Sequence, residues 1–203
     1  ALRGALPADG RAGVDPRWIY AGQALLVGGL LVLLWRHYGG LVRQNLPSPR
    51  EWLLAVGVGI AVFGLWITLT APWMLAGKPV ASFVPVNEAG ALDWPLIAFR
   101  LLGAAIVVPL MEELFWRGFL MRWIDSPVFE VVDPQRVSLK AVVLSTFVFT
   151  LAHTQWLAAA LAGLAYAGIY RHTGKLWTAV AAHAVTNALL GVWVIHTRQW
   201  SFW

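Results

Sequence analysis

Residues 94–123 read WPLIAFRLLGAAIVVPLMEELFWRGFLMRW. This stretch is apolar for most of its length and has a tryptophan at each end. About 20 helical residues cross a bilayer core of about 30 Å, and indole rings favour the boundary between that core and the headgroups. The stretch therefore predicts a membrane-spanning helix. It also contains residues that are rare in such helices: Arg100, Pro109, Glu112, Glu113 and Arg117.

The composition of the whole chain supports a membrane location. Hydrophobic residues make up 59% of its 203 residues and charged residues 12%, whereas ordinary globular chains have about 45–50% and about 25%. A water-soluble protein of this composition would lack polar surface, so we expect an integral membrane protein in contact with the lipid bilayer. The absence of cysteine excludes disulfides, thiolate nucleophiles, zinc–thiolate sites and iron–sulfur clusters.

The hydropathy pattern divides the chain into a short N-terminal non-membrane segment, residues 1–17, and a single helical domain, residues 18–203. We expect an all-α, polytopic membrane bundle of about six transmembrane helices. The predicted spans are approximately Trp18–Trp35, Trp52–Met74, Trp94–Trp123, Lys140–His153, Trp156–Tyr170 and Leu176–Ile195. The fourth and fifth are short for a bilayer core, which predicts that one of them is re-entrant.

The net charge of +5 is interpreted as setting the orientation of the protein in the membrane rather than as binding nucleic acid. No basic run with interleaved aromatic residues is present, so nucleic acid is not an expected partner. Six spans place both termini on one side of the membrane. With the termini outside, most of the loop lysines and arginines face the cytoplasm, as the positive-inside rule requires. The sequence therefore predicts a multi-pass protein of the cell (inner) membrane.

Two adjacent carboxylates lie inside the third predicted span. Glu113 precedes Arg117 by four residues, the spacing at which an acid and a base pair on one helix face. Glu112 points about 100° away, and its neighbours at helical spacing are a proline and two aromatic residues. A charge in an apolar helix is costly unless it is paired or faces a polar cavity, so Glu112 is a candidate functional residue. The alternative is that the helix ends near Leu110 and the charges form an interfacial cluster.

Two further predicted spans carry polar residues at helical spacing. Phe149 and His153 lie on one face of the fourth, and His183 and Asn187 lie on one face of the sixth. Polar groups in lipid gain most by converging on a shared interior site. We therefore expect the two histidines, the asparagine and Glu112 to meet.

These side chains suit peptide hydrolysis by an activated water. Glu112 would accept a proton from the water, His153 would orient that water or serve the leaving amine, and His183 with Asn187 would donate hydrogen bonds to the oxyanion. Glu112, His153 and His183 could instead bind zinc. No H-E-x-x-H motif is present, so a site without a cofactor is favoured over zinc. A serine mechanism through Ser145 is less favoured because there is no G-x-S-x-G turn.

The three motifs also carry a family resemblance. In chain order they read Glu112-Glu113-x-x-x-Arg117, Phe149-x-x-x-His153 and His183-x-x-x-Asn187. This ordered set within hydrophobic segments resembles the CPBP family, which comprises type II CAAX prenyl endopeptidases and bacteriocin-processing relatives. The resemblance covers approximately residues 94–203. The fuller strings are most similar to the CAAX prenyl protease-related proteins of bacterial exosortase systems: Glu112–Trp123, His153–Gly163, His183–Asn187 and Gln199–Trp203.

The resemblance implies an all-helical intramembrane endopeptidase acting on a membrane-associated protein or peptide, with an exosortase-system protein as a partner. It implies Glu112 as the catalytic base, His153 beside it, and His183 with Asn187 at the oxyanion. Glu113, Arg117 and Phe149 match supporting positions. It does not carry over the substrate.

Two other functions remain open at this stage. A non-enzymatic chaperone or immunity-type membrane protein would keep the polar cluster for helix assembly. A small ion or proton carrier would need ionisable residues spread across the membrane depth, which is not the pattern here.

The predicted topology separates two of the candidate residues, because Glu112 and His153 would differ in membrane depth by about 10 Å or more at 1.5 Å per residue. A tilted fourth helix, or a re-entrant segment at residues 153–155, would remove this difference.

Overall fold

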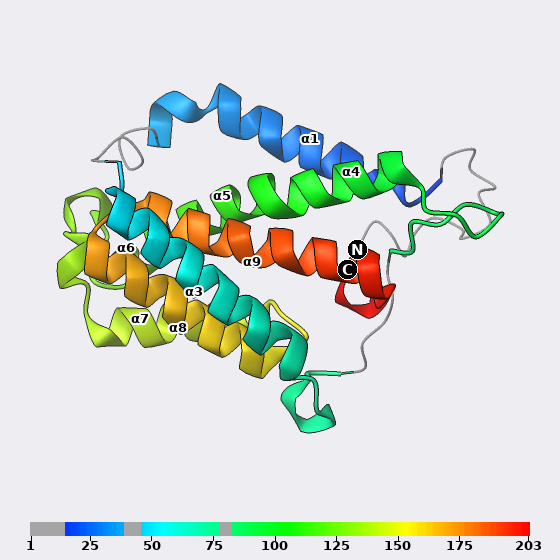
Figure 1. Ribbon diagram of the computed structural model, residues 1–203. Helices are drawn as coiled ribbons and strands as arrows, with labels where there is room; N and C mark the ends of the chain where they lie inside the picture. The colour runs from blue at the N-terminus through cyan, green and yellow to red at the C-terminus, as the bar shows by residue number, and fades with distance from the viewer. Residues whose placement is uncertain (1–14, 39–45, 78–82) are drawn as a thin grey trace.

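A computed structural model describes residues 15–38, 46–77 and 83–203. In these residues the chain forms helices that lie side by side in one bundle, and no strand occurs among them (Figure 1). The predicted all-α bundle is confirmed. Most of the predicted N-terminal segment, residues 1–14, lies outside the described residues.

The long helices occupy the segments in which spans are predicted. They are α1 (Trp18–Leu33), α3 (Pro49–Thr68), a continuous helix over Trp94–Trp123, α7 (Leu139–Leu151), α8 (Trp156–Thr173) and α9 (Leu176–Thr197). The continuous helix consists of α4 (Trp94–Leu102), the π-helical segment η3 (Gly103–Val107), α5 (Val108–Glu113), the π-helical segment η4 (Leu114–Leu120) and α6 (Met121–Trp123). Single 3₁₀ turns lie in the connections, η2 (Pro72–Met74), η5 (Phe129–Val131) and η6 (Pro134–Arg136), and one follows α9, η7 (Trp200–Phe202).

The second predicted span extends too far. It was expected to reach Met74, but α3 ends at Thr68 and a separate 3₁₀ turn begins at Pro72. Proline disfavours helical backbone in the residue before it, and Ala71 is extended accordingly. The other predicted helices agree with the structure to within three residues at either end.

Three of the helices are long and apolar enough to cross a membrane: Pro49–Thr68, Trp94–Trp123 and Leu176–Thr197. The apolar helices α1 and α7 are shorter, with 16 and 13 residues. The described chain is therefore a helical bundle of the kind found in membranes, with helices of unequal length.

Helix starts follow from local capping. The Ser48 side chain accepts a hydrogen bond from the Glu51 amide, the Glu51 carboxylate accepts one from the Ser48 amide, and Pro49 occupies the first helical position. This capping box satisfies amide groups that the first turn leaves without partners. Ser138 and Asp93 cap α7 and α4 by the side-chain acceptor alone, Ser138 from the Ala141 amide and Asp93 from the Leu96 amide.

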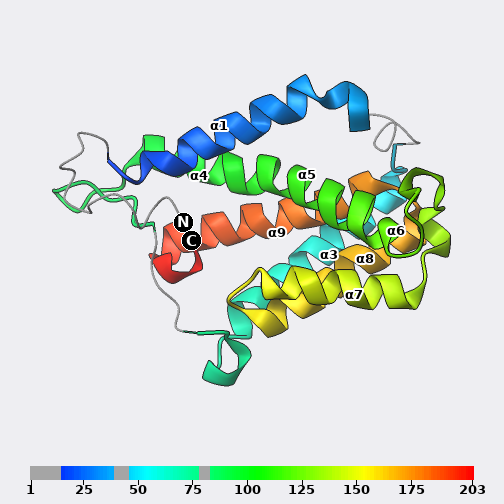
Figure 2. The same ribbon diagram turned by 180° about the vertical axis from the view of Figure 1, so that it is seen from behind.

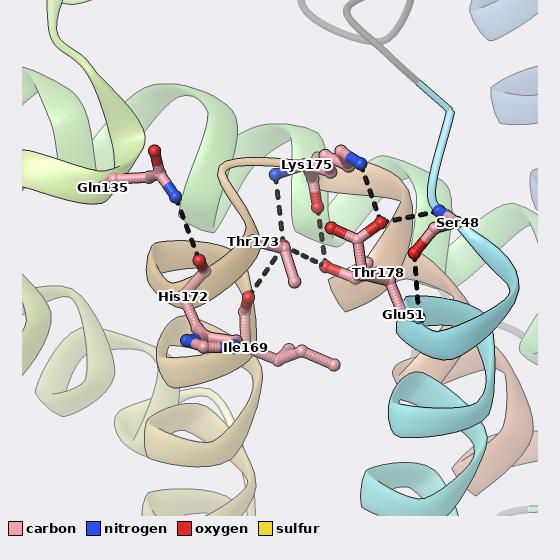
Figure 3. Close-up of polar contacts among 8 residues, drawn as sticks. All are labelled: Ser48, Glu51, Gln135, Ile169, His172, Thr173, Lys175 and Thr178. Carbon is pink, nitrogen blue, oxygen red and sulfur yellow. Dashed lines mark hydrogen bonds and ion pairs between the residues drawn. The ribbon is translucent and has the colours of Figure 1, made fainter.

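A polar network joins helix ends at the side of the bundle where α3 begins and α8 ends (Figure 3). Lys175 Nζ lies 2.7 Å from Glu51 Oε2, and the Thr173 hydroxyl bonds the Ile169 carbonyl and the Thr178 hydroxyl. We call the ion pair of Glu51 and Lys175, together with the Ser48 cap, the helix-end pair. It ties the start of α3 to the turn between α8 and α9.

Helix α9 lies in the middle of the bundle, against α3, α8 and α5 (Figures 1 and 2). Its approach to α3 requires Gly59, because a Cβ there would lie 2.5 Å from the Ala182 carbonyl oxygen. The Thr186 hydroxyl donates a hydrogen bond to the Gly59 carbonyl at 2.9 Å. Small residues at such contacts allow close backbone packing in membrane helices. This contact sets the position of the α9 side chains described next.

Candidate active site

A cavity of about 320 Å³ lies between α5, α9 and the turn that joins α7 to α8. Its lining includes the four candidate catalytic residues predicted from the sequence: Glu112, His153, His183 and Asn187. Phe149 also lines it. Glu113 and Arg117 do not line the cavity and are buried beside it. The structure therefore brings the three motifs together around one space.

The short length of α7 explains how His153 reaches this cavity. Helix α7 has only 13 residues, and His153 follows its end in the turn at residues 152–155. In Figure 2 this turn stops well short of the level at which α4 begins. Both Glu112 and His153 line the same cavity, so the expected difference in depth does not keep them apart.

A buried charge cluster stands directly behind the cavity. Glu113 Oε1 lies 3.1 Å from Arg117 Nη1 and 2.8 Å from His183 Nδ1. The side chains of Glu113 and Arg117 are 0% and 2% exposed, so the pair predicted from their spacing is present and fully enclosed. We call Glu113, Arg117 and His183 the buried charge cluster. The link from Glu113 to His183 is not predictable from sequence spacing because it joins α5 to α9.

Arg117 is held on several sides. Its Nη2 donates a hydrogen bond to the Gly163 carbonyl of α8 at 3.0 Å. The guanidinium carbon lies 4.9 Å from the centre of the Phe149 ring and 5.6 Å from that of the Tyr166 ring. Such cation–π contacts strengthen when they are removed from water. Arg117 therefore joins η4 to α7 and α8 while it neutralises Glu113.

The orientation of His183 is fixed from two directions. Its ring stacks on Tyr166, with centroids 5.0 Å apart and planes at 16°, and the Tyr166 hydroxyl donates to the Thr186 hydroxyl at 2.8 Å. The carboxylate of Glu113 can only accept a hydrogen bond, so His183 Nδ1 carries a proton. The other ring nitrogen, Nε2, is left for chemistry in the cavity.

His153 is oriented by its own helix. Its Nδ1 lies 2.8 Å from the Phe149 carbonyl oxygen, which can only accept, so Nδ1 carries the proton. In the neutral ring Nε2 is then an acceptor. The ring packs between Phe149 and Trp66, with centroid distances of 4.4 Å and 5.7 Å. Phe149 is therefore both the ring beneath Arg117 and the residue that sets the His153 tautomer.

Asn187 donates a hydrogen bond to a main-chain carbonyl that has no amide donor within its own helix. The Val108 amide donates to Gly103, five residues back, and Pro109 has no amide proton to give to Ala104 in the same register. Asn187 Nδ2 donates instead to the Ala104 carbonyl at 2.8 Å. One of its two N–H groups is thus used in joining α9 to η3, and the second remains.

Glu112 and Glu113 each have a buried Oε2 atom without a hydrogen-bond partner among the described residues, but of the two only Glu112 lines the cavity. A buried carboxylate oxygen without a donor is costly and marks a position at which a ligand or water is needed. Glu112 is therefore the acceptor that this cavity leaves available.

A second cavity of about 520 Å³ adjoins the first. The two share four lining residues from three segments: Trp66, His153, and the adjacent Phe202 and Trp203. The remaining lining of the second cavity includes uncharged polar side chains from Thr70, Gln155, Gln199 and Ser201. Gln155 also bonds the Trp66 carbonyl at 2.9 Å and so fixes one wall. The motifs gave no signal for this second cavity, except that residues 199–203 belong to the string compared above.

The zinc alternative concerns Glu112, His153 and His183, which all line the cavity. Within the described ranges no three His, Asp or Glu side chains are grouped as a metal site requires. The hydrogen bonds of His183 Nδ1 to Glu113 and of His153 Nδ1 to a carbonyl leave Nε2 of each ring as the nitrogen that could bind a metal, which is the usual arrangement of ligating histidines.

The fold and this cavity define a class: a membrane-type helical bundle with a carboxylate, two histidines and an amide around a buried space. Residues 94–189 match the sequence model of one family, described as type II CAAX prenyl endopeptidase Rce1-like. The matched residues contain all three motifs, so this part of the chain is similar to that family. No curated protein and no solved structure matches the chain.

Proposed function

We propose that this protein is an intramembrane endopeptidase that hydrolyses a peptide bond of a membrane-associated protein or peptide. The observation that carries the proposal is the carboxylate of Glu112, which lines a cavity with two histidines and has a buried oxygen without a donor among the described residues. The similarity of residues 94–189 to CAAX-type endopeptidases supports the same class of reaction.

In the proposed mechanism a water molecule binds between Glu112 and His153. Nε2 of His153 accepts one hydrogen bond from this water and Glu112 accepts the other, because Nδ1 of His153 is committed to the Phe149 carbonyl. As the water attacks the substrate carbonyl carbon, Glu112 takes its proton. The carbon–nitrogen bond then breaks, and Glu112 returns the proton to the leaving amine.

The developing oxyanion needs hydrogen-bond donors on the side of the substrate carbonyl that faces away from Glu112 and the water. We assign this role to the remaining N–H of Asn187 and to Nε2 of a protonated His183. The Glu113 carboxylate, 2.8 Å from His183 Nδ1, stabilises that protonated ring, and Arg117 balances the charge of Glu113. Preorganised donors of this kind typically contribute a factor of about 10²–10³ each to the rate. Glu113 is thus a positioning residue.

The proposal includes location and partners. We place the protein in the bacterial inner membrane as a multi-pass protein, with an exosortase-system protein as a candidate partner on the strength of the motif resemblance alone. No cofactor is required by the mechanism.

The test uses the purified chain in detergent with a panel of membrane-anchored fluorogenic peptides. Glu112→Gln should reduce the rate of cleavage by at least about 10²-fold, because it removes the general base. Glu88→Gln, which changes an exposed carboxylate in the loop at residues 83–93, is the matched control and should cleave as the unaltered chain does.

Two results would contradict the proposal. Unaltered cleavage by Glu112→Gln would exclude Glu112 as the base, and failure of the unaltered chain to cleave any peptide would favour a non-enzymatic chaperone or immunity role. A chelator should leave the rate unchanged. If it abolishes cleavage, zinc bound by Glu112, His153 and His183 replaces the mechanism above.

A further inference from the structure

One wall of the second cavity is held by hydrogen bonds between two connections. The chain that follows α3 lies against the turn between α7 and α8. The Ala76 amide donates to the Thr154 carbonyl at 2.7 Å, and Trp156 Nε1 donates to the Trp73 carbonyl at 2.9 Å. Residues of both connections line the cavity. This wall is therefore fixed before a ligand arrives, which lowers the entropic cost of binding.

The lining of this cavity combines aromatic rings with uncharged polar side chains. The rings belong to Trp66, Trp193, Phe202 and Trp203, and the polar side chains to Thr70, Thr154, Gln155, Gln199 and Ser201. All of these polar residues except Gln155 are exposed, so they lie at the open side of the cavity. A ligand that fits this lining needs apolar surface and hydrogen-bonding groups together.

Gln155 offers a positioned acceptor close to a candidate catalytic residue. It is half-buried and follows His153 by two residues, and both line the cavity. Its Nε2 donates to the Trp66 carbonyl at 2.9 Å, which fixes the side-chain amide. The oxygen Oε1 is the part of this amide that accepts hydrogen bonds. Gln155 can therefore bind an N–H group of a ligand without giving up its own bond to Trp66.

This lining matches a peptide main chain better than a lipid chain. An extended peptide carries an N–H and a C=O group in each residue, repeated every 3.3–3.6 Å or so. These groups can pair with hydroxyl and amide side chains while the apolar side chains of the peptide contact the aromatic rings. A hydrocarbon chain would displace water from the same polar groups without replacing the hydrogen bonds, which is costly.

We propose that the second cavity binds an extended segment of the substrate with apolar side chains, and that Gln155 Oε1 accepts a hydrogen bond from a main-chain N–H of that segment. A sphere of 520 Å³ is about 10 Å across, which accommodates about three extended residues. His153 lines both cavities, so the segment continues into the cavity that holds Glu112. This inference rests on the proposed function and assigns to it a substrate-binding residue.

The test measures binding to the Glu112→Gln chain in detergent, so it does not depend on catalysis. The probe is a fluorescent N-acetylated nonapeptide of alanine and leucine with a C-terminal amide. A matched series of peptides replaces one N–H at a time by an ester oxygen, which removes a donor and keeps the shape. A fluorescent alkyl chain of equal apolar area represents a lipid.

The nonapeptide should bind at least tenfold more tightly than the alkyl chain. At one or more positions the ester should weaken binding about three- to tenfold, the usual effect of losing one hydrogen bond. Addition of Gln155→Leu should abolish the ester effect at one of these positions, because the acceptor is then absent. Gln23→Leu, at an exposed position of α1, is the matched control and should leave every ester effect unchanged.

A second variant keeps the test valid if Gln155→Leu fails to fold. Ser201→Trp introduces a large ring at the open side of the cavity, at an exposed position, and should weaken binding of the nonapeptide at least tenfold. Ala89→Trp, at an exposed position in the loop at residues 83–93, is its control and should bind the nonapeptide as the Glu112→Gln chain does.

Three results would overturn this inference: ester effects that all persist in Gln155→Leu, nonapeptide binding that survives Ser201→Trp, and an alkyl chain that binds as tightly as the peptide. The last result would assign the cavity to a lipid chain. Each of them leaves cleavage by the unaltered chain standing. Absence of that cleavage overturns the proposed function whatever the binding result.

Discussion

The buried charge cluster and the helix-end pair use the same chemistry in opposite surroundings. In each, a glutamate meets a basic side chain and links separate helices. Glu113 and Arg117 are 0% and 2% exposed, whereas Glu51 and Lys175 are 23% and 20% exposed. The first contacts the candidate active site, and the second lies where helices begin and end (Figure 3).

This difference in burial changes what each interaction does. A partly wet pair is screened, and either partner can turn to water when the other is lost. A fully enclosed carboxylate has no such alternative, so removal of its partner leaves an uncompensated charge. Loss of one member of the buried charge cluster should therefore reduce the stability of the fold strongly. Loss of one member of the helix-end pair should affect only the contact between the start of α3 and the start of α9.

The largest effect is expected from Arg117→Met. The substitution keeps most of the side-chain volume but leaves the carboxylate of Glu113 buried without its cation. We expect a loss of about 3–5 kcal/mol in the free energy of unfolding, measured by denaturant titration in mixed micelles. Glu113→Gln together with Arg117→Met should recover part of that loss, because no charge is then buried alone. A loss no larger than that of Lys175→Met would contradict the comparison.

An intermediate effect is expected at Asn187, where the buried contact carries no charge. Asn187→Leu leaves the Ala104 carbonyl without its donor and should cost about 1–3 kcal/mol. Pro109→Ala provides an amide that can donate to that carbonyl, so the cost of Asn187→Leu should be about 1 kcal/mol smaller in the Pro109→Ala chain. The four unfolding curves of this double-mutant cycle measure the coupling. Additive costs would show that Pro109 does not create the need for Asn187.

The smallest effect is expected from Lys175→Met in the helix-end pair. The Ser48 side chain and amide still cap α3 through Glu51 after the change, and the exposed carboxylate is solvated. The unfolding midpoint should fall far less than in Arg117→Met, and the difference from the unaltered chain should shrink further in high salt, which screens exposed pairs. A midpoint that does not respond to salt would indicate that Lys175 acts by packing instead.

The helices could be predicted from the sequence because length and hydropathy determine them locally. The long run at residues 94–123 is apolar over more than a bilayer thickness, and the structure has a helix over the same residues. The predicted end of the second span was wrong because residues 69–74 remain mostly apolar after α3 has ended. Hydropathy reports burial in lipid, whereas the stop depends on the backbone around Pro72.

In the candidate site, contacts within one helix could be predicted from the sequence and contacts between helices could not. The Glu113–Arg117 pair follows from spacing within one helix. The bonds from Glu113 to His183 and from Asn187 to Ala104 join residues at least 70 positions apart, so only the packing of α9 against α5 and η3 shows them. The contacts of the Arg100 guanidinium with the Tyr20 and Phe83 rings also join separate segments, so no local pattern predicts them.

The short α7 has a consequence for the surrounding lipid. Its 13 residues extend about 20 Å, about 10 Å less than a typical hydrocarbon core. Lipid tails beside α7 must shorten or tilt to match it, at a cost of a fraction of a kcal/mol for each Å of hydrophobic mismatch. With the protein in a membrane, as proposed, acyl-chain length therefore becomes a physical variable of the helix that leads into the His153 turn.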